Sequence, residues 1–231
     1  MIKNYDDFIT ALLEAGFSIS GGNNEGVYSV ISWNWNETPS YDTPVRWHTG
    51  DPETDPWEWR MLVLAERNDI AYSKIFFRKA GYITKAWYPY FLAARRGGKS
   101  FDEMYADGKY SNYAKRIYEL LCDNDSLPVH EIKSLGGFDK KDTSKFEKAL
   151  IDLQMGMFIT MSGMQQRVSQ IGLEYGWFST AFCITERFWS DDVFEQAADI
   201  TVKEAEEKIT NRVLELNPLA DVKKIVKFIY G

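Results

Sequence analysis

The sequence predicts an α+β protein dominated by helices, with a winged helix-turn-helix between an aromatic-rich N-terminal part and a helical C-terminal tail. First, three helical patterns of apolar residues follow one another between residues 110 and 156. Second, β-forming residues at 157–161 and 167–169 come next, as they would in a hairpin. Third, a chain of 231 residues with 45% hydrophobic content can hold one large domain or two small ones with real cores. The expected regions are an aromatic-rich α+β part over 1–108, the winged helix over 109–190 and a helical extension over 191–231.

The first part of the chain is expected to begin with a helix, a turn and a strand. Asn4 suits an N-cap and Gly16 a helix end, so the first helix should lie between them. The glycines at 21–22 suit a hairpin turn, because they lack the preceding strand, the spacing and the lysine of a phosphate-binding loop. β-branched and aromatic residues then predict a strand over 27–35.

Residues 71–100 form a wholly basic segment, with seven Lys and Arg and no carboxylate. We expect paired strands at 74–77 and 82–84 around a turn at 79–81, then a helix over 87–96 closed by glycines. Cations interleaved with aromatic side chains suit a nucleic-acid backbone and unstacked bases. The alternative is that the aromatic residues form the core while the cations offset the acidic residues 1–70 of the same domain. The nucleic-acid candidates in this segment are Arg78, Lys79, Lys85, Arg95 and Arg96.

The central part of the chain has the order of elements of the winged fold. Apolar spacing predicts helices over 113–121, 129–135 and 142–156. A strand at 157–161, a turn at 162–163 and a returning strand at 167–169 should follow as the wing. Any small α+β domain with the same order of elements is the alternative. Further helices are expected over 191–198, 201–216 and 221–230, packed against the winged domain or against a second copy of the chain.

The predicted third helix and wing carry residue types that contact a duplex. Cations at the start and on the exposed face of the helix suit phosphates, and short polar side chains suit groove contacts. The candidates are Lys140, Lys141, Ser144, Lys145 and Lys148 on the helix and Arg167 on the wing. Glu147 and Asp152 on the same helix would weaken phosphate binding. Winged helices also serve as protein-docking modules, which is a second interpretation of the same pattern.

Three motifs carry a resemblance to a known family. They are FEKALIDLQMGMFIT at 146–160, YGW at 175–177 and ERFW at 186–189. With them, residues 110–189 resemble the winged-helix proteins related to the AlkZ DNA glycosylases. The resemblance implies the winged fold and nucleic-acid ancestry. Those glycosylases use a Gln-x-Gln or Gln-x-Asp pair to position water when they excise an alkylated base. This sequence has no such triplet, since Gln165 and Gln166 are adjacent while Gln154 and Gln170 stand alone.

Residues 47–60 are the densest group of reactive and aromatic side chains. They suggest a pocket in which a general base lies beside stacking surfaces. The pocket candidates are Trp47, His48, Asp51, Asp55, Trp57, Trp59 and Arg60, and the catalytic candidates are Asp55, His48 and Gln165. The alternative is structural: Asp55 followed by Pro56 is an N-cap with proline at the first helical position.

Composition sets limits on the other functions. Only two His and two unclustered Cys are present, so we expect no metal, no disulfide framework and no cofactor. No run approaches the roughly 18 apolar residues of a spanning helix, so we expect a cytoplasmic protein without membrane contact. A net charge of −7 opposes extensive phosphate contact. We expect a duplex DNA-binding protein without catalysis, with an alkylated-base glycosylase and a protein-interaction or small-ligand module as alternatives.

Overall fold

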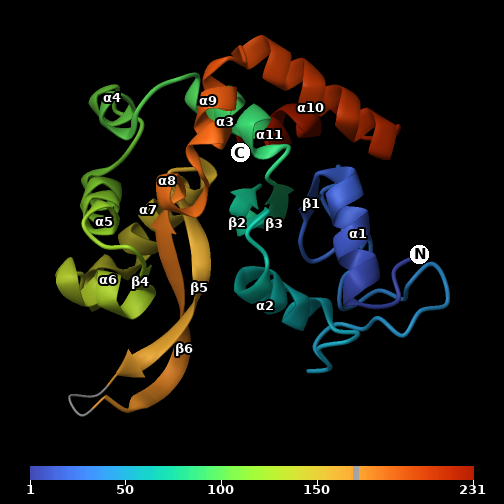
Figure 1. Ribbon diagram of the computed structural model, residues 1–231, viewed down its shortest axis with the longest axis horizontal. Coiled ribbons are helices and arrows are strands. Elements are labelled where there is room, and N and C mark those ends of the chain that lie inside the picture. Colours follow the sequence, from blue (N-terminus) through green and yellow to red (C-terminus); the bar gives the residue numbers. More distant parts are fainter. Residues whose placement is uncertain (169–171) are drawn as a thin grey trace. The chain divides into compact units, whose positions relative to one another are not determined.

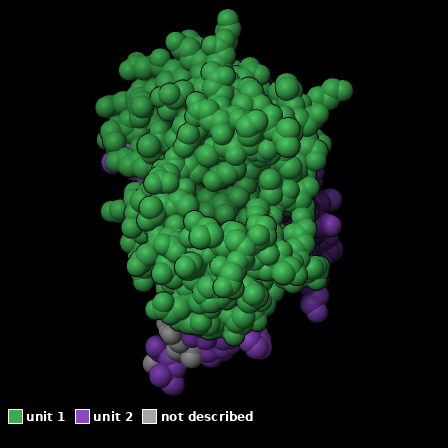
Figure 2. Space-filling view, turned by 90° about the vertical axis from the view of Figure 1, so that its right-hand side faces the viewer, with its two compact units in different colours: residues 1–98, 191–231 green, residues 99–190 purple. Residues whose placement is uncertain are grey.

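The computed structural model describes residues 1–168 and 172–231 (Figure 1). The chain is α+β, and its described residues form helices and two three-stranded antiparallel sheets. It divides into two compact units, which Figure 2 shows in different colours. Unit 1 comprises residues 1–98 and 191–231, and unit 2 comprises residues 99–190.

Unit 1 combines a small sheet with helices from both ends of the chain. Its elements are α1 (Tyr5–Ala15), β1 (Phe17–Ile19), α2 (Pro56–Glu66), β2 (Ile70–Phe76), β3 (Lys79–Thr84), α3 (Tyr88–Arg96), α9 (Asp191–Ala198), α10 (Val202–Leu216) and α11 (Val222–Tyr230). The strand order is β1-β3-β2. The predicted caps are present, since Asn4 accepts a hydrogen bond from the Asp7 amide and Gly16 adopts the left-handed conformation.

The β2–β3 hairpin turns earlier than the sequence predicted. Phe77 and Arg78 occupy the turn with φ of 51° and 62°, a backbone twist that matches paired strands. The predicted turn at 79–81 is wrong, because these residues lie in β3. Gly81 serves close packing there, since a Cβ at this position would lie 2.4 Å from the Phe76 ring.

The predicted strand over 27–35 is also wrong, because this stretch is irregular. Its apolar side chains Val27, Ile31 and Trp33 are nevertheless buried. Side chains and carbonyls replace a strand ladder: the Ile19 amide donates to the Tyr28 carbonyl, and the Val30 amide donates to Ser18 Oγ. The sequence pattern of residues 27–35 therefore matches their burial, but the backbone conformation predicted from it was wrong.

The three C-terminal helices of unit 1 pack on α3. Their core is aromatic, with the Phe76 and Phe228 rings stacked at 4.0 Å between centroids and Phe91 edge-on to Phe76. We expected these helices to lie against the winged domain or a second copy, but they belong to the same unit as residues 1–98. This packing joins segments more than 90 residues apart, which helical periodicity alone does not specify.

Unit 2 contains a cluster of helices followed by a hairpin. Its elements are α4 (Phe101–Ala106), α5 (Asn112–Cys122), β4 (Leu127–Pro128), α6 (Val129–Leu135), the 3₁₀ turn η1 (Lys140–Asp142), α7 (Thr143–Met155), β5 (Ile159–Val168), β6 (Glu174–Ile184) and α8 (Thr185–Phe188). The sheet order is β4-β6-β5. Ile117, Phe146, Leu153 and Phe158 are buried in its core.

The β5–β6 hairpin is longer than predicted (Figure 1). The predicted turn at 162–163 is wrong, because Gly163 lies within β5 opposite Ala181 at a register shift. Glycine at such a position marks a bulge, which looks like a turn signal in the sequence. Arg167 consequently lies on the outgoing strand rather than the returning one. Ser169, assigned to the returning strand, lies outside the described residues.

Within the part of the chain that the structure describes, no helix combines the length and apolar character needed to cross a membrane.

Candidate nucleic-acid interface

The exposed face of α7 and the preceding turn η1 carry the lysine candidates of unit 2. Phe146, Leu150 and Leu153 recur at helical spacing and are buried, which leaves the opposite face of the helix in solvent. The side chains of Lys140, Lys141, Ser144, Lys145 and Lys148 are all exposed. The turn that leads into α7 is fixed by Asp139, whose carboxylate accepts a hydrogen bond from the Lys141 amide at 3.0 Å.

Several of these lysines already have partners within unit 2. Lys141 Nζ lies 3.1 Å from the Asp139 carboxylate, and Lys148 Nζ lies 2.6 Å from that of Asp152. Lys145 Nζ lies 5.6 Å from the centre of the Tyr113 ring. Both ion pairs involve lysine side chains that are at least 71% exposed, so each contributes little to stability.

Tyr113 also orders the start of α7. Its hydroxyl donates a 2.7 Å hydrogen bond to Asp142, which lowers the pKa of Asp142 and raises that of Tyr113. Asp142 therefore stays ionised at neutral pH beside the helix N-terminus, where a negative charge is favourable. Lys140 and Lys141 therefore lie in an ordered turn at the start of α7.

The hairpin presents polar and aromatic side chains to solvent. Gln165 and Arg167 on β5 are exposed. On β6, Tyr175 is 51% exposed, Trp177 is 95% exposed and Phe178 is 61% exposed. We did not nominate these aromatic residues as functional from the sequence. Trp177 and Phe178 are adjacent on a strand, where neighbouring side chains point to opposite faces of the sheet. One face of the sheet cannot bury both rings, and this signal could have identified them from the sequence.

The cations of the basic segment lie in unit 1, where Lys79, Lys85 and Arg95 make contacts with residues far along the chain. Lys79 pairs with Glu25, and Lys85 Nζ lies 3.0 Å from Asp192. Arg95 donates through Nε to the Ile229 carbonyl at 2.7 Å, at the end of α11. Arg78 occupies the β2–β3 turn, and Arg96 is half-buried at the end of α3. Of these contacts, the Lys79–Glu25 pair matches the alternative in which the cations offset the acidic residues 1–70, whereas Lys85 and Arg95 contact the C-terminal helices.

Asp55 is at the centre of the 47–60 segment and is completely buried. Its Oδ1 accepts hydrogen bonds from the His48 amide at 3.0 Å and the Trp57 amide at 2.8 Å. Its Oδ2 accepts from the Gly50 amide at 2.9 Å. The carboxylate thus caps α2 and closes the preceding loop, as the structural interpretation predicted.

The other pocket candidates spread between the surface and the core. Trp59 is fully buried. His48 is exposed, with its ring 4.8 Å from the Trp57 ring, and the Arg60 guanidinium lies 3.5 Å from the centre of that ring. Trp47 is half-buried and close to His48. Asp51 is exposed, and a hydrogen bond from Thr54 lowers its pKa.

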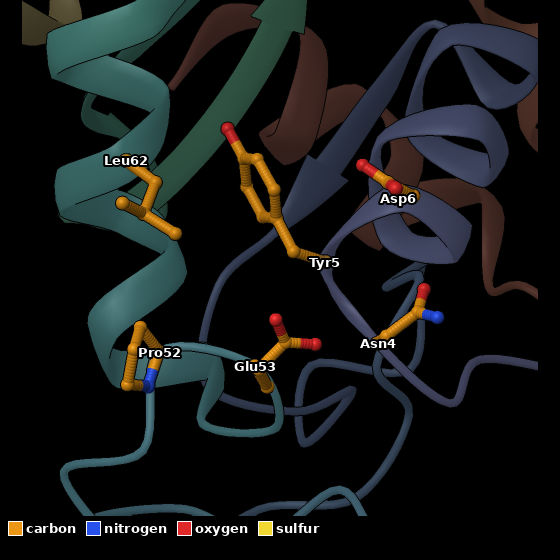
Figure 3. Close-up of a pocket in the computed structure, with 6 residues that line it drawn as sticks. All are labelled: Asn4, Tyr5, Asp6, Pro52, Glu53 and Leu62. Atoms are coloured by element: carbon orange, nitrogen blue, oxygen red, sulfur yellow. The ribbon is translucent and has the colours of Figure 1, made fainter.

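A separate cavity of 180 Å³ lies between α1 and the segment that leads into and through α2 (Figure 3). It is lined by Asn4, Tyr5, Asp6, Pro52, Glu53 and Leu62. Burial, reinforced by the charge of Glu66, raises the pKa of Tyr5 to about 12. None of the seven pocket candidates is among these lining residues, so the cavity is distinct from the predicted pocket. Among the described residues, no group of His, Cys, Asp and Glu side chains is arranged to hold a metal ion.

Comparison with protein families decides the relationship that the sequence motifs suggested. The model of the family described as AlkZ related matches residues 2–230. The chain belongs to the AlkZ-related family. The match extends beyond the 110–189 region that carries the motifs and includes both units of this AlkZ-related protein. Searches of curated proteins and of solved structures find no match.

Proposed function

We propose that this AlkZ-related protein binds duplex DNA through residues 109–190, folded as a winged helix-turn-helix, and that it does not excise bases. The proposal rests on the exposed lysine-bearing face of α7 and the hairpin that follows it in the chain. The element order α5, β4, α6, α7, β5, β6 and the sheet order β4-β6-β5 support the winged interpretation. In a helix-turn-helix, the second helix of the motif enters the major groove, which here is α7.

The residue types divide into positioning and groove contacts. Lys140 and Lys141, at the start of the helix, are placed to contact phosphates, while Ser144 and Lys145 in its first turn suit the groove. Arg167 adds a cation on β5. Four lysines against three carboxylates over 140–155 provide weak electrostatic attraction, so phosphate contacts should be few.

The hairpin supplies a different kind of contact. Trp177 is almost entirely exposed and Tyr175 about half exposed, on alternate residues of β6. Aromatic side chains bind bases by stacking wherever a base is unstacked or frayed. We therefore assign the hairpin to the nucleic-acid surface together with α7.

The absence of catalysis is supported by the chemistry of the candidate residues. The glutamine triplet of the glycosylases is missing from the sequence. Asp55, the best alternative carboxylate, accepts three backbone hydrogen bonds and caps a helix. Both observations favour a binding role.

A titration of a fluorescein-labelled duplex by the full chain tests this function through fluorescence anisotropy. We expect saturable binding at low salt that weakens to a Kd of about 100 μM or more at physiological salt, because the contacts are few and sequence-independent. Absence of binding at low salt would contradict the proposal and favour a protein-docking role for the same fold.

A further inference from the structure

A cluster of exposed rings in unit 1 is left unused by the proposed function. It consists of Trp35, His48 and Trp57, and we call it the tryptophan cluster. Trp35 is 60% exposed and Trp57 is 41% exposed, whereas Trp33 and Trp59 in the same segment are buried. Tryptophan left in solvent next to another exposed ring is uncommon unless the surface has a partner.

The rings are held in a fixed arrangement around His48. The His48 ring lies 4.8 Å from Trp57 and 6.0 Å from Trp35, with interplanar angles of 55° and 59°. The backbone of His48 has φ of 62°, and its amide donates to the buried carboxylate of Asp55. A residue with a Cβ in this conformation is uncommon, so the surrounding loop must hold it in place.

The charges around the cluster select the partner. Residues 34–60, the segment that contributes the three rings, carry six carboxylates and two cationic side chains, Arg46 and Arg60. Four of these carboxylates are exposed, namely Glu37, Asp42, Asp51 and Glu53. Such a surface repels phosphate and attracts cations. The cluster already binds a cation of its own chain, since the Arg60 guanidinium stacks 3.5 Å from the centre of the Trp57 ring.

We propose that the tryptophan cluster binds an arginine-rich segment of another protein. A planar guanidinium stacks on a tryptophan face, and the acidic segment that carries the rings offers carboxylates to compensate its charge. Trp35 offers the larger free surface for this contact, and further arginines of the segment pair with the exposed carboxylates. The site uses residues of unit 1 alone and does not depend on the DNA-binding role of unit 2.

The test uses the full chain and a fluorescein-labelled peptide of alternating arginine and glycine. Its control peptide replaces arginine by citrulline, which keeps the shape and removes the charge. We expect the arginine peptide to bind and the citrulline peptide to bind at least about tenfold more weakly. Equal affinity of the two peptides would overturn the proposal.

Variants then separate ring stacking from general charge attraction. Trp35→Ala together with Trp57→Ala leaves the net charge unchanged and should weaken arginine-peptide binding about tenfold or more. The matched control is Trp177→Ala, which removes a 95% exposed tryptophan from unit 2 and should leave the affinity unchanged. Parental affinity in the double variant, or an equal loss in the control, would contradict a site at the cluster.

His48→Gly distinguishes the site from a folding defect. Glycine adopts φ of 62° freely, and Asp55 bonds the backbone amide, which the substitution retains. The variant should keep the parental Tm while binding the arginine peptide more weakly, because the rings lose the side chain between them. Unchanged affinity in this folded variant would remove His48 from the site and count against the proposed arrangement.

Discussion

At the residue scale, Asp55 shows how one buried carboxylate organises a surface loop. A charge taken out of water is unfavourable unless it is fully hydrogen-bonded. Asp55 meets this condition with three backbone amides, two from the loop before α2 and one from its first turn. The side chain therefore links the loop that carries His48 to the helix that carries Trp57.

Replacing the Asp55 carboxylate should make the protein easier to unfold. We expect Asp55→Ala to lower the free energy of unfolding by about 2–4 kcal/mol, because it removes a helix cap and leaves buried amides without acceptors. Urea denaturation followed by circular dichroism measures the change. Glu53→Ala is the matched control, since Glu53 is exposed, and should change stability by less than about 0.5 kcal/mol. Similar midpoints for Asp55→Ala and the parent would show that the cap contributes little.

Cys183 predicts a specific response to alkaline pH. Burial raises the pKa of its thiol from the ordinary value of 9.0 to about 11. Above pH 9 the unfolded chain loses this proton while the folded chain keeps it, so stability should fall as the pH rises toward 11. Urea midpoints at neutral and alkaline pH, compared between the parent and Cys183→Ala, isolate the effect. A parent and variant with the same pH dependence would exclude Cys183 as its source.

At the element scale, signals contained within one helical turn were reliable, whereas signals whose meaning depends on a partner strand were not. The caps of α1 and α2 were identified correctly because a cap depends on residues within one helical turn. The turn at 162–163 was not, because a Gly in a bulge and a Gly in a turn look alike without the partner strand. The conformation of residues 27–35 was predicted wrongly for a similar reason. These residues form hydrogen bonds with β1, and only the folded chain brings the two segments together.

The candidate sites show the same difference between signals from neighbouring residues and signals from distant ones. Asp55 was recognised as a cap from its neighbour Pro56 alone. Trp35 was missed as a partner of His48, because 13 positions and an irregular loop separate the two rings. The contacts of Lys85 with Asp192 and of Arg95 with α11 join residues more than 100 positions apart, so the sequence alone left their role open.

The face of α7 can be tested by charge reversal. Lys145→Glu together with Lys148→Glu should abolish duplex binding, because two cations on the exposed face become phosphate-repelling carboxylates. Stability should change by less than about 0.5 kcal/mol for each exposed substitution. Anisotropy with the labelled duplex and thermal melts measure both properties.

The matched control reverses two exposed lysines on another helix, with the same change in net charge. Lys203→Glu together with Lys208→Glu on α10 serves this purpose. We expect the control to bind the duplex far better than the α7 variant. Equal losses in the two variants would indicate a general charge effect, and parental binding by the α7 variant would exclude α7 as the contact surface.

At the scale of the whole molecule, charge limits how the protein can bind DNA. The net charge of −7 opposes association, so only a local basic face can provide attraction. With about four phosphate contacts, affinity should fall about a hundredfold between about 50 and 200 mM salt. Anisotropy titrations over this range give the slope. An affinity independent of salt would contradict backbone contact by α7 and its neighbours.

The last prediction concerns catalysis in the complete protein. Excising an alkylated base requires a carboxylate or amide that orients water beside the sugar, and loss of such a group lowers the rate by orders of magnitude while binding survives. Among the three catalytic candidates, Asp55 has both oxygens engaged by amides, His48 lies in the exposed tryptophan cluster and Gln165 lies on the hairpin.

We therefore expect no release of free base when an alkylated duplex is incubated with excess protein and the products are separated by chromatography. The decisive control is Asp55→Asn, which keeps the shape of the side chain and removes its charge. Time-dependent release by the parent that disappears in a folded Asp55→Asn variant would make the 47–60 segment an active site. Release that persists in this variant would place the catalytic group elsewhere. Either result would show that the protein is a glycosylase and contradict a role in binding alone.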